Sequence, residues 1–463
     1  MKVQVHKMKT KPKPLDFRRV TMKGIDDAFD TGRITAAVVG TGHIGLLLAC
    51  HFAQANAKVF GVDVNADVVS KINSGKSPFF ELESENLVKK SVDEGRLKAT
   101  EDISLALSRA NVVIVSVPTP LNEMHKPDLA CLLKATEDVG KGLRKGSVVV
   151  IASTVYVGAT RNLILPILEE RSGLRAGRDF LLGCVPQRID PGNRVHRLDN
   201  TPLNVGGIDK RSSDVIAALF ERIVNAEVKK VSALEVAEGS KLVENTYRDV
   251  NIAFANELSI FFEKLGIDAN EVLDACSTKW SFQPHYPGPG VGGPCIPTSP
   301  RYLLQNANSS ELRMVRLARE INDRMPDRVV DLIARGLKEL SPRTLVSGPK
   351  IAVLGLTYKK DVGDTRDSPA KKVIDGLKRL SFEVAVHDPV LPVSTMKFGC
   401  KNLSLEEAAK DADCLVFLTD HTAFENSIKK LERLVHDPCV LVDTKRIFAA
   451  SGFLKTRFRY KRI

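Results

Sequence analysis

From about residue 34 onward, short runs of apolar, often β-branched residues alternate with stretches whose apolar residues recur at helical spacing. Continuous apolar runs of this length are typical of parallel strands that are buried on both faces of a sheet. Because strands alternate with helices, this part of the chain is predicted to form a doubly wound α/β sheet. The predicted strands lie at 34–40, 57–64, 111–120, 147–154, 180–186 and 202–207.

After residue 231 the pattern changes to that of one long helix. Residues 232–265 contain no proline and a single glycine, and their apolar residues keep helical spacing. Ser232 with Glu235 fits a capping box at the start, and Gly266 fits the end of the helix. Further helix is expected to about residue 278.

A loop crowded with proline and glycine, QPHYPGPGVGGPCIP at 283–297, follows this helix. Such a segment fixes the backbone shape and lets a ligand approach closely. A third region then repeats the alternation, with predicted strands at 350–359, 382–389, 413–421 and 439–444. The predicted fold class is therefore α/β, with two doubly wound, Rossmann-like domains joined by a long central helix.

The chain carries 68 Lys and Arg against 56 Asp and Glu, a formal net charge of +12. The basic residues are spread along the sequence, with clusters at 2–23 and 455–462 that we interpret as solvated termini. Nucleic-acid binding through these termini is the alternative. It predicts an affinity that falls steeply with salt and that disappears without residues 1–23. We expect no nucleic-acid partner, although a positive field would speed encounter with a phosphate-bearing substrate.

Two further classes of protein are disfavoured by the composition. No run of 18 or more apolar residues occurs, and the basic N-terminus lacks the apolar stretch of a secretion signal, so we expect a cytoplasmic protein without a membrane partner. The eight cysteines form no CxxC pair, which favours reduced thiols. His and Cys do not cluster at zinc-ligand spacing, so no metal site is predicted.

The segment GTGHIG at 40–45 has the spacing of a dinucleotide-binding loop and stands between a predicted strand and a predicted helix. Gly40 allows the tight turn, Gly42 lets the backbone approach a pyrophosphate, and Gly45 permits close packing of the helix. His43 and Ile44 open that helix, whose free N–H groups suit phosphates. The alternative is a glycine turn in an ordinary α/β protein.

Asp63 ends the second predicted strand, 23 residues beyond Gly40. A carboxylate at this position can accept hydrogen bonds from ribose hydroxyls, and its charge would repel a 2′-phosphate. No arginine follows closely, so the predicted cofactor is NAD rather than NADP.

Cys295 stands in the proline- and glycine-rich loop, after Gly292-Gly293-Pro294. A thiol in a rigid loop can be exposed, and nearby N–H groups or a lysine could lower its pKa. The alternative is a buried structural cysteine.

Lys241, Asn245 and Arg248 lie on one side of the long predicted helix. This face suits a phosphorylated or polyhydroxyl ligand, and a buried lysine can serve as an acid or a base. The alternative is a solvated polar face. In the third region Lys359 and Arg366 follow a strand end, where ligands bind in such sheets.

Together these motifs resemble the UDP-sugar 6-dehydrogenases of the UDP-glucose/GDP-mannose dehydrogenase superfamily, across roughly residues 34–450. The branch that oxidises UDP-N-acetyl-hexosamines, such as UDP-ManNAc or UDP-GlcNAc, is the most similar, through RxxPG at 188–192 and CIP at 295–297. The matching stretches are VVGTGHIGL, VPTPL, the pair ST at 153–154, PQRIDPGN, EGSKLVENTYRDVNIAFANEL, YPGPGVGGPCIP and GLTYKKDVGDTRDSPA.

The resemblance implies a four-electron oxidation of the sugar C6 hydroxyl to a carboxylate, with two NAD. Cys295 would add to the intermediate aldehyde and then carry a thioester that water cleaves. Lys241 and Asn245 would bind the developing oxyanion. Thr119 would place a water or touch the cofactor, and Thr154 would line the nicotinamide side.

The resemblance also implies the remaining site and the domain plan. The long helix would form the core of a homodimer or higher homo-oligomer, with Arg366 reaching a neighbouring subunit. The implied domains are a basic tail at 1–32, an NAD-binding domain at 33–228, a central helical domain at 229–325 and a UDP-sugar-binding domain at 326–463. The implied substrate-binding residues are Gln187, Arg188, Ile189, Lys241, Asn245, Arg248, Gly292, Lys359 and Arg366.

Several positions depart from the family pattern. Gln187 and Ala152 replace glutamates, Ser299 replaces an aspartate, and Thr298 replaces a lysine. Glutamine cannot take a proton from the water that attacks the thioester, and serine offers only a neutral substitute for the aspartate. An enzyme impaired at this step, or a non-catalytic protein that binds nucleotide sugar and NAD, is therefore the alternative to a working dehydrogenase.

Overall fold

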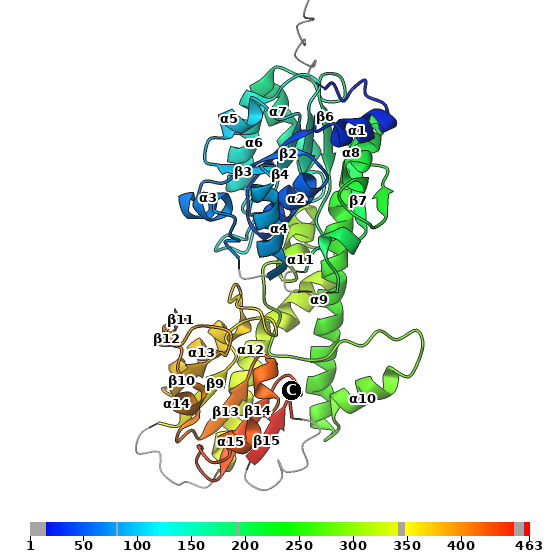
Figure 1. The fold of residues 1–463 in the computed structure, drawn as a ribbon. Coiled ribbons are helices and arrows are strands. Elements are labelled where there is room, and N and C mark those ends of the chain that lie inside the picture. The colour runs from blue at the N-terminus through cyan, green and yellow to red at the C-terminus, as the bar shows by residue number, and fades with distance from the viewer. Residues whose placement is uncertain (1–14, 80–81, 191–192, 194, 341–347, 449–457) are drawn as a thin grey trace, which may run out of the picture. The chain divides into compact units, whose positions relative to one another are not determined.

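The computed structural model describes residues 15–79, 82–190, 193, 195–340, 348–448 and 458–463 (Figure 1). By their contacts the residues divide into two units, Met1–Lys241 and Leu242–Ile463. The boundary falls within the long helix α9 (Leu234–Lys264). The division of the sequence into four regions stays a prediction.

The first unit is built on an eight-stranded sheet with the strand order β3-β2-β1-β4-β5-β6-β7-β8. β1 to β6 run parallel, and β7 pairs antiparallel with β6. All six strands predicted for this region are confirmed, and β3 and β8 are additional. The strands are β1 (Thr35–Val39), β2 (Lys58–Val62), β3 (Leu97–Thr100), β4 (Val112–Val115), β5 (Val148–Ile151), β6 (Leu181–Cys184), β7 (Leu203–Gly207) and β8 (Val228–Lys230).

Helices cover both faces of this sheet, which confirms the doubly wound class (Figure 1). On one face α1, α2 and α8 share an apolar cluster with Val38 and Ile114 of the central strands. α5, α6 and α7 pack together against the other face. The helices are α1 (Met22–Asp30), α2 (His43–Gln54), α3 (Ala66–Asn73), α4 (Leu82–Asp93), α5 (Ile103–Leu107), α6 (Ala130–Gly142), α7 (Leu165–Ser172) and α8 (Lys210–Glu221), with a π-helix at Thr160–Ile164 and a 3₁₀ turn at Leu198–Asn200.

The prediction of a basic tail over 1–32 is wrong for residues 15–32, and residues 1–14 lie outside the described residues. Phe17 is fully buried, and α1 carries Ile25, Ala28 and Phe29 into the core of the first unit. The spacing of these three residues is that of one helical face. Thr21 caps the helix by accepting the N–H of Gly24.

α9 begins and ends close to the predicted bounds, and its two ends differ in how well the sequence predicts them. The C-terminal prediction is confirmed, because Gly266 has a φ of +74° and the N–H groups of Gly266 and Ile267 return to Glu263 and Phe262. The capping box is wrong: the helix begins at Leu234, and the Glu235 carboxylate pairs with Arg161 Nε at 2.5 Å.

The second unit carries a five-stranded parallel sheet with the order β10-β9-β13-β14-β15. α12 and α13 pack on one face, and α14 and α15 on the other. The strands are β9 (Lys350–Leu354), β10 (Glu383–His387), β13 (Cys414–Phe417), β14 (Cys439–Asp443) and β15 (Phe458–Arg462), with a small pair β11 (Met396–Lys397) and β12 (Cys400–Lys401). The helices that follow α9 are α10 (Ala269–Cys276), α11 (Thr298–Leu303), α12 (Arg313–Glu339), α13 (Pro369–Arg379), α14 (Leu405–Ala409) and α15 (Ile428–Leu431), with 3₁₀ turns at Leu304–Asn306 and Thr422–Phe424.

The interpretation of 455–462 as a solvated terminus is wrong for residues 458–462, which form β15, and 455–457 lie outside the described residues. β15 is an edge strand, so only Phe458 needs full burial and the alternating basic residues can face water. Lys461 pairs with Glu339, and Arg462 with Asp268. The strand was missed because its apolar content is low for a buried strand.

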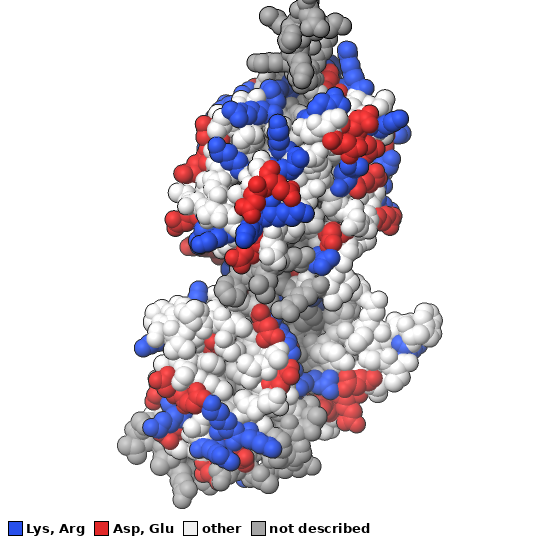
Figure 2. Space-filling view, in the orientation of Figure 1, with Lys and Arg blue, Asp and Glu red and all other residues white. Residues whose placement is uncertain are grey.

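Charge and hydropathy of the described residues bear on two expectations. On the face drawn in Figure 2, the described basic and acidic side chains are interspersed rather than gathered into one basic patch. Among the described helices none is both long and apolar enough to cross a membrane.

Candidate functional site

The glycine-rich turn between β1 and α2 has three glycines with different reasons for lacking a side chain. Gly40 has a φ of +88°, and a Cβ there would meet the Ser116 carbonyl. A Cβ at Gly45 would overlap the carbonyl oxygen of Gly40. At Gly42 an added Cβ would meet nothing within 4 Å, so the chain itself does not require glycine there. The open space above Gly42, at the N-terminus of α2, fits the pyrophosphate of a dinucleotide.

Asp63 lies beside this turn at the end of β2. Its Oδ2 accepts hydrogen bonds from the N–H and the hydroxyl of Thr41, both at 2.9 Å, and its Oδ1 accepts from the N–H of Asn65 at 3.0 Å. These contacts hold the carboxylate at the edge of the sheet where ribose hydroxyls are bound in dinucleotide-binding folds. His43 stacks on Phe79 with ring centroids 3.9 Å apart, and Ile44 packs against the core.

Thr119 and Thr154 come from the segments that follow the neighbouring strands β4 and β5. The Thr119 hydroxyl donates to the carbonyl oxygen of Thr154 at 2.8 Å, so the structure brings these two predicted residues together. Ser153 donates to the carbonyl of Val117 at 2.8 Å and ties the same two segments together. Both segments leave the carboxyl edge of the sheet, where α/β folds bind ligands.

Gln187, Arg188 and Ile189 follow β6. Gln187 is buried, and its Nε2 donates to the carbonyl of Val185 at 2.9 Å. Its Oε1 is also buried and finds no hydrogen-bond partner in the part of the chain that the structure describes. Arg188 donates to the carbonyl of Pro202 at 3.0 Å, and Ile189 packs against the core. This oxygen is therefore available as a hydrogen-bond acceptor.

Glu238 of α9 was missed by the sequence analysis. Its carboxylate accepts the N–H of Gly158 at 2.6 Å and of Thr160 at 2.8 Å, at the start of the π-helix that follows β5. Burial raises the pKa of Glu238 above its ordinary value. These two hydrogen bonds fix the backbone of the segment that follows Thr154. Nothing in the local sequence marks it, because the partners are about 80 residues apart.

Cys295 is exposed and lies three residues before α11, which excludes the alternative of a buried structural cysteine. By contrast, burial raises the pKa of Cys50 to about 12 and holds the pKa of Cys184 and Cys414 well above the ordinary value. The predicted nucleophile is thus accessible from solvent, whereas these three thiols are buried.

The loop around Cys295 rests on the segment that follows β9. The N–H of Gly293 donates to the carbonyl of Arg366 at 3.1 Å. A Cβ on Gly292 would come within 2.9 Å of Tyr358, Asp367 and Pro369 atoms, so this loop needs glycine for close approach. The structure therefore brings Cys295, Gly292 and Arg366 to one place in the second unit.

Asn245 is connected to the cysteine loop through Ser299. Asn245 Nδ2 donates to Ser299 Oγ at 2.9 Å, and the Ser299 hydroxyl donates to the carbonyl oxygen of Cys295 at 2.9 Å. Asn245 and Ser299 are buried, so the alternative of a solvated polar face is wrong at Asn245. On the same helix Lys241 is half-buried and Arg248 is exposed.

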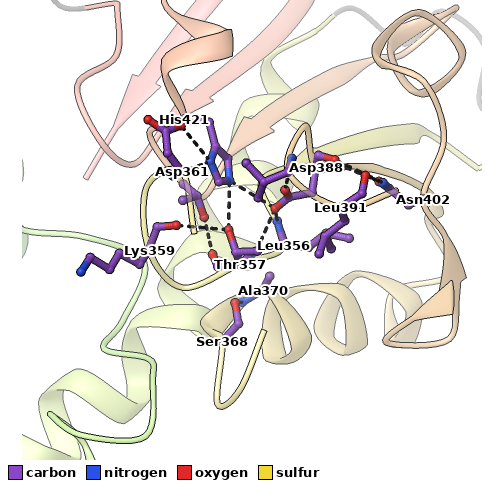
Figure 3. A network of polar contacts seen from close by, with 12 residues as sticks. Leu356, Thr357, Lys359, Asp361, Ser368, Ala370, Asp388, Leu391, Asn402 and His421 are labelled. Atoms are coloured by element: carbon purple, nitrogen blue, oxygen red, sulfur yellow. Dashed lines mark hydrogen bonds and ion pairs between the residues drawn. The ribbon is translucent and has the colours of Figure 1, made fainter. Parts of the chain in front are cut away.

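Lys359 and Arg366 belong to the loop between β9 and α13, which a buried network orders (Figure 3). Arg366 forms a two-pronged pair with Asp364, whose hydrogen bond raises the pKa of Arg366. Thr357 donates to the carbonyl of Lys359 at 3.3 Å, and the Lys359 side chain points away from the network in Figure 3. Ser368 accepts the N–H of Ala370 and caps α13.

His421 and Asp388 stand at the centre of this network and are fully buried. The N–H of Asp361 donates to His421 Nδ1 at 3.0 Å, so Nδ1 is unprotonated and the ring carries its proton on Nε2. Nε2 lies 3.2 Å from Asp388 Oδ2 and 3.0 Å from the Thr357 hydroxyl. The network thus fixes the Lys359 loop at Thr357 and at Asp361.

Asp388 gives a pH-dependent prediction for this network. Burial pulls the pKa of Asp388 up, but hydrogen bonds from His421 and from the N–H groups of Leu356 and Thr357 outweigh it, so the folded pKa lies below the ordinary value. Such a carboxylate stabilises the fold above its unfolded pKa, and the contribution is lost as the pH falls through the folded pKa. Asp388→Asn is expected to lose roughly 2 kcal/mol at neutral pH.

Urea unfolding of both proteins between pH 3 and pH 7 measures this difference. The gap between wild type and Asp388→Asn should narrow below about pH 4, near the unfolded pKa of aspartate. A gap that is constant with pH would contradict a charged, stabilising Asp388.

Lys445, which follows β14, was also missed. Its Nζ lies 3.3 Å from the position that a Cβ of Gly288 would take, so the ammonium approaches the loop that carries Cys295. The described residues offer its Nζ no hydrogen bond or ion pair, and burial lowers the pKa of Lys445 while Asp420 opposes that effect. The rule that ligands bind at carboxyl ends of parallel strands could have found it.

Comparison with known proteins agrees with this arrangement. Models of the UDP-glucose/GDP-mannose dehydrogenase family match the chain in three parts: the NAD binding domain at 34–224, the central domain at 235–324 and the UDP binding domain at 352–450. Protein CapL of Staphylococcus aureus is 37% identical over 416 residues, which cover 89% of this chain and 95% of CapL. A UDP-N-acetyl-D-mannosamine dehydrogenase of Pyrococcus horikoshii is 35% identical over 84% of this chain and 90% of its own length.

Solved structures are similar over almost the whole chain. The UDP-D-ManNAc dehydrogenase from Pyrococcus horikoshii superposes with a TM-score of 0.84 at 34% identity, covering 93% of this chain and 99% of that one. The UDP-N-acetyl-mannosamine dehydrogenase Cap5O from Staphylococcus aureus has a TM-score of 0.80 at 30% identity, covering 92% and 98%. With its NAD-binding fingerprint and these matches, the chain belongs to the UDP-glucose/GDP-mannose dehydrogenase family and uses NAD as its cofactor.

Proposed function

We propose that this protein oxidises the C6 hydroxyl of a UDP-N-acetyl-hexosamine, such as UDP-ManNAc, to the carboxylate, with Cys295 as the nucleophile. The observation that carries the proposal is the exposed Cys295 on a glycine-rich loop that is tied to Asn245 through Ser299 and to Arg366 through Gly293. The names of the acetamido-sugar dehydrogenases among its relatives support the choice of sugar.

The proposed chemistry proceeds in two oxidations and one hydrolysis. NAD, when bound, supplies the hydride acceptor for both oxidations. Removal of a hydride and a proton from the C6 alcohol gives an aldehyde, to which the Cys295 thiolate adds to form a thiohemiacetal. Removal of a second hydride from its carbon and of the proton from its hydroxyl leaves a thioester on Cys295. Water then cleaves the carbon–sulfur bond, which releases the carboxylate and restores the thiol.

The remaining predicted site residues have distinct proposed roles. Lys241 and Asn245 would stabilise the oxyanion of the thiohemiacetal, and Lys241 would also move protons. The Ser299 hydroxyl accepts from one N–H of the Asn245 amide, so it would orient that amide toward the reacting carbon. Thr119 and Thr154 would hold the nicotinamide side, as their mutual hydrogen bond supports.

Cations and the RxxPG segment provide the proposed contacts to the UDP-sugar. Lys359, Arg366 and Lys445 lie at the carboxyl edge of the second sheet and would neutralise the diphosphate. Arg188 and Arg248, with the backbone of Ile189 and Gly292, would complete the substrate contacts. Lys445 adds to the predicted set because of its approach to Gly288.

Gln187 and Ser299 leave the hydrolysis without a charged base at the two positions where the family has one. Loss of general-base assistance typically slows a step by about 10²–10⁴-fold. The unpartnered Oε1 of Gln187 can still accept a hydrogen bond from a water and orient it. We therefore propose a slow final step rather than an inactive protein.

The test is NADH formation, followed at 340 nm, with a panel of UDP-sugars that includes UDP-ManNAc, UDP-GlcNAc and UDP-glucose. Steady turnover with two NADH per sugar supports the proposal. A burst of at most two NADH per active site means that the thioester is trapped. No NADH with any sugar, despite measurable NAD binding, overturns the proposal in favour of a non-catalytic binding protein.

We also propose that α9 forms the core of a homodimer. Val243, Tyr247, Phe254 and Phe261 follow one another at intervals of four and seven residues and are all exposed in the single chain. This spacing places them on one face of the helix, as at the seam between paired helices. An exposed apolar stripe of this length marks an interaction surface.

Phe254→Glu is expected to dissociate this dimer. A central aromatic residue of an interface typically contributes at least about 2 kcal/mol, and an unpaired buried charge adds to the loss, so the dissociation constant should rise at least about 100-fold. Sedimentation velocity at micromolar concentration measures the change. Met124→Glu, which places the same charge at another exposed apolar position, is the control. A wild type that sediments as a monomer would contradict the proposal.

A further inference from the structure

A network of buried polar side chains joins α9 to α12 in the second unit. Asp249 and Asn256 come from α9, and Arg319 and Asn322 from α12; each is at most 4% exposed. Arg319 Nη1 donates to Asp249 Oδ1 at 2.5 Å. Asn322 Nδ2 donates to the backbone oxygen and to Oδ1 of Asp249, at 2.9 and 2.8 Å.

One end of this network reaches the loop that carries Cys295. Asn256 Nδ2 donates to Asn322 Oδ1 at 2.9 Å, and Asn256 Oδ1 accepts the backbone N–H of Gly288 at 2.9 Å. Asn256 is thus held on both sides of its amide, by the loop on one side and by α12 on the other. Gly288 lies seven residues before Cys295.

The other end reaches the segment that follows Cys295. Arg319 Nη2 donates to Asp323 Oδ1 at 2.5 Å, and Asp323 Oδ2 accepts from Arg301 of α11 at 2.6 Å. Arg301 lies six residues after Cys295. The segment 288–301 is therefore tied to the same network on both sides of the thiol.

The loop contacts α12 at the turn where Pro326 interrupts the backbone hydrogen bonds of the helix. Pro326 has no N–H, so the carbonyl of Asn322 lacks its ordinary partner four residues later. A Cβ on Gly290 would lie 3.4 Å from that carbonyl oxygen and 3.3 Å from Pro326 Cδ, so the loop packs closely against this turn. Its shape depends on the same part of α12 that holds the network.

Burial of the charges of Asp249 and Arg319 carries a desolvation cost. Within the described part of the chain, Asp249 Oδ2 and Arg319 Nε find no hydrogen-bond partner. A buried ion pair is often no more stabilising than apolar side chains of the same size. What a hydrogen-bonded network provides, and apolar packing does not, is one defined orientation of the groups at its ends.

We infer that this network is a positioning device for the nucleophile, and that Asn256 is the positioning residue that acts on Cys295 through Gly288. The inference rests on the proposed function, in which Cys295 attacks the aldehyde. A displacement of the thiol by about 1 Å is enough to slow such a step on the order of 10²-fold.

The experiment compares three variants of the full-length protein. Asn256→Ala removes the acceptor of the Gly288 N–H and is expected to lower kcat about 10- to 100-fold while the KM for NAD stays unchanged. Asn256→Asp keeps an acceptor for that N–H but loses the donor to Asn322 Oδ1, so it should retain more activity than Asn256→Ala. Asn251→Ala is the matched control, because Asn251 lies on the same helix and, among the described residues, its Nδ2 bonds only to the Tyr247 carbonyl of its own helix.

The rate of Cys295 alkylation by iodoacetamide, followed by mass spectrometry of the peptide, provides a readout that needs no sugar. It should change at least about threefold in Asn256→Ala and remain as in wild type in Asn251→Ala, since a moved thiol meets different neighbours. If Asn256→Ala does not fold, Arg301→Met tests the other end of the network in the same assays.

The outcomes separate this inference from the proposed function. Wild-type kcat and alkylation rate in folded Asn256→Ala would overturn the positioning role, as would an equal loss of activity in Asn256→Asp and Asn256→Ala. A wild type that turns over no UDP-sugar would instead overturn the proposed function. The alkylation rates would then still show whether Asn256 positions the thiol.

Discussion

Cys295→Ala is expected to abolish steady NADH formation with the UDP-sugar that the wild type oxidises. The first hydride transfer needs no thiol, but the second needs the thiohemiacetal that only Cys295 can form. Removal of a covalent nucleophile costs on the order of 10⁴-fold or more in kcat. Single-turnover yield should therefore fall from two NADH per active site to at most one, while NAD binding is unchanged. Rapid mixing with absorbance at 340 nm measures both quantities.

Cys276→Ala is the matched control, because Cys276 is also exposed and belongs to the same unit. It should turn over like the wild type. A Cys295→Ala protein that still delivered two NADH per sugar would show that the aldehyde is oxidised without a covalent adduct. The proposed mechanism would then be wrong, although the protein would remain a dehydrogenase.

The second large effect distinguishes two glycines of the dinucleotide loop. Gly45→Ala places a Cβ against the Gly40 carbonyl, and relief of that overlap requires α2 to move away from the sheet. The free energy of unfolding is expected to fall by about 3 kcal/mol. Gly42→Ala meets nothing within 4 Å, and Gly42 has a φ of −63°, which alanine adopts readily, so stability should stay within about 1 kcal/mol of wild type.

The affinity for NAD should also distinguish Gly42→Ala from Gly45→Ala. In Gly42→Ala the Cβ occupies the space where the pyrophosphate approaches the backbone, and the loss of one or two charge-assisted hydrogen bonds weakens binding roughly 10- to 100-fold. Urea unfolding and calorimetric titration with NAD measure the two quantities. A Gly42→Ala protein that binds NAD as tightly as wild type would place the pyrophosphate elsewhere.

Several sequence predictions hold because they depend on neighbours along the chain. The buried strands, α9 and the turn at Gly40 follow from apolar periodicity and from glycine, and the structure has them within a few residues of the predicted bounds. Asp63 beside Thr41 also follows, because one βα unit brings the ends of β1 and β2 together. Cys295 was singled out by the glycine and proline around it.

The errors and omissions share a different cause. α1 was missed because its apolar face is short, and β15 because an edge strand needs little apolar sequence. The predicted capping box is wrong because the Glu235 carboxylate pairs with the Arg161 guanidinium, 74 residues away in the sequence. No local sequence pattern indicates the roles of Glu238, Lys445 and the Asn256 network. Each of them contacts a segment that is remote in the sequence.

Ser299 shows the division between the two sources most clearly. From the sequence it is only a neutral residue where the family has an aspartate. In the structure its hydroxyl joins Asn245, 54 residues away, to the carbonyl of Cys295. The sequence by itself determined the fold class, the NAD loop and the candidate nucleophile, since these arise from residues close together in the chain. Only the tertiary structure decided what holds the nucleophile in place, because those hydrogen bonds join residues that meet only when the helices and the loop pack together.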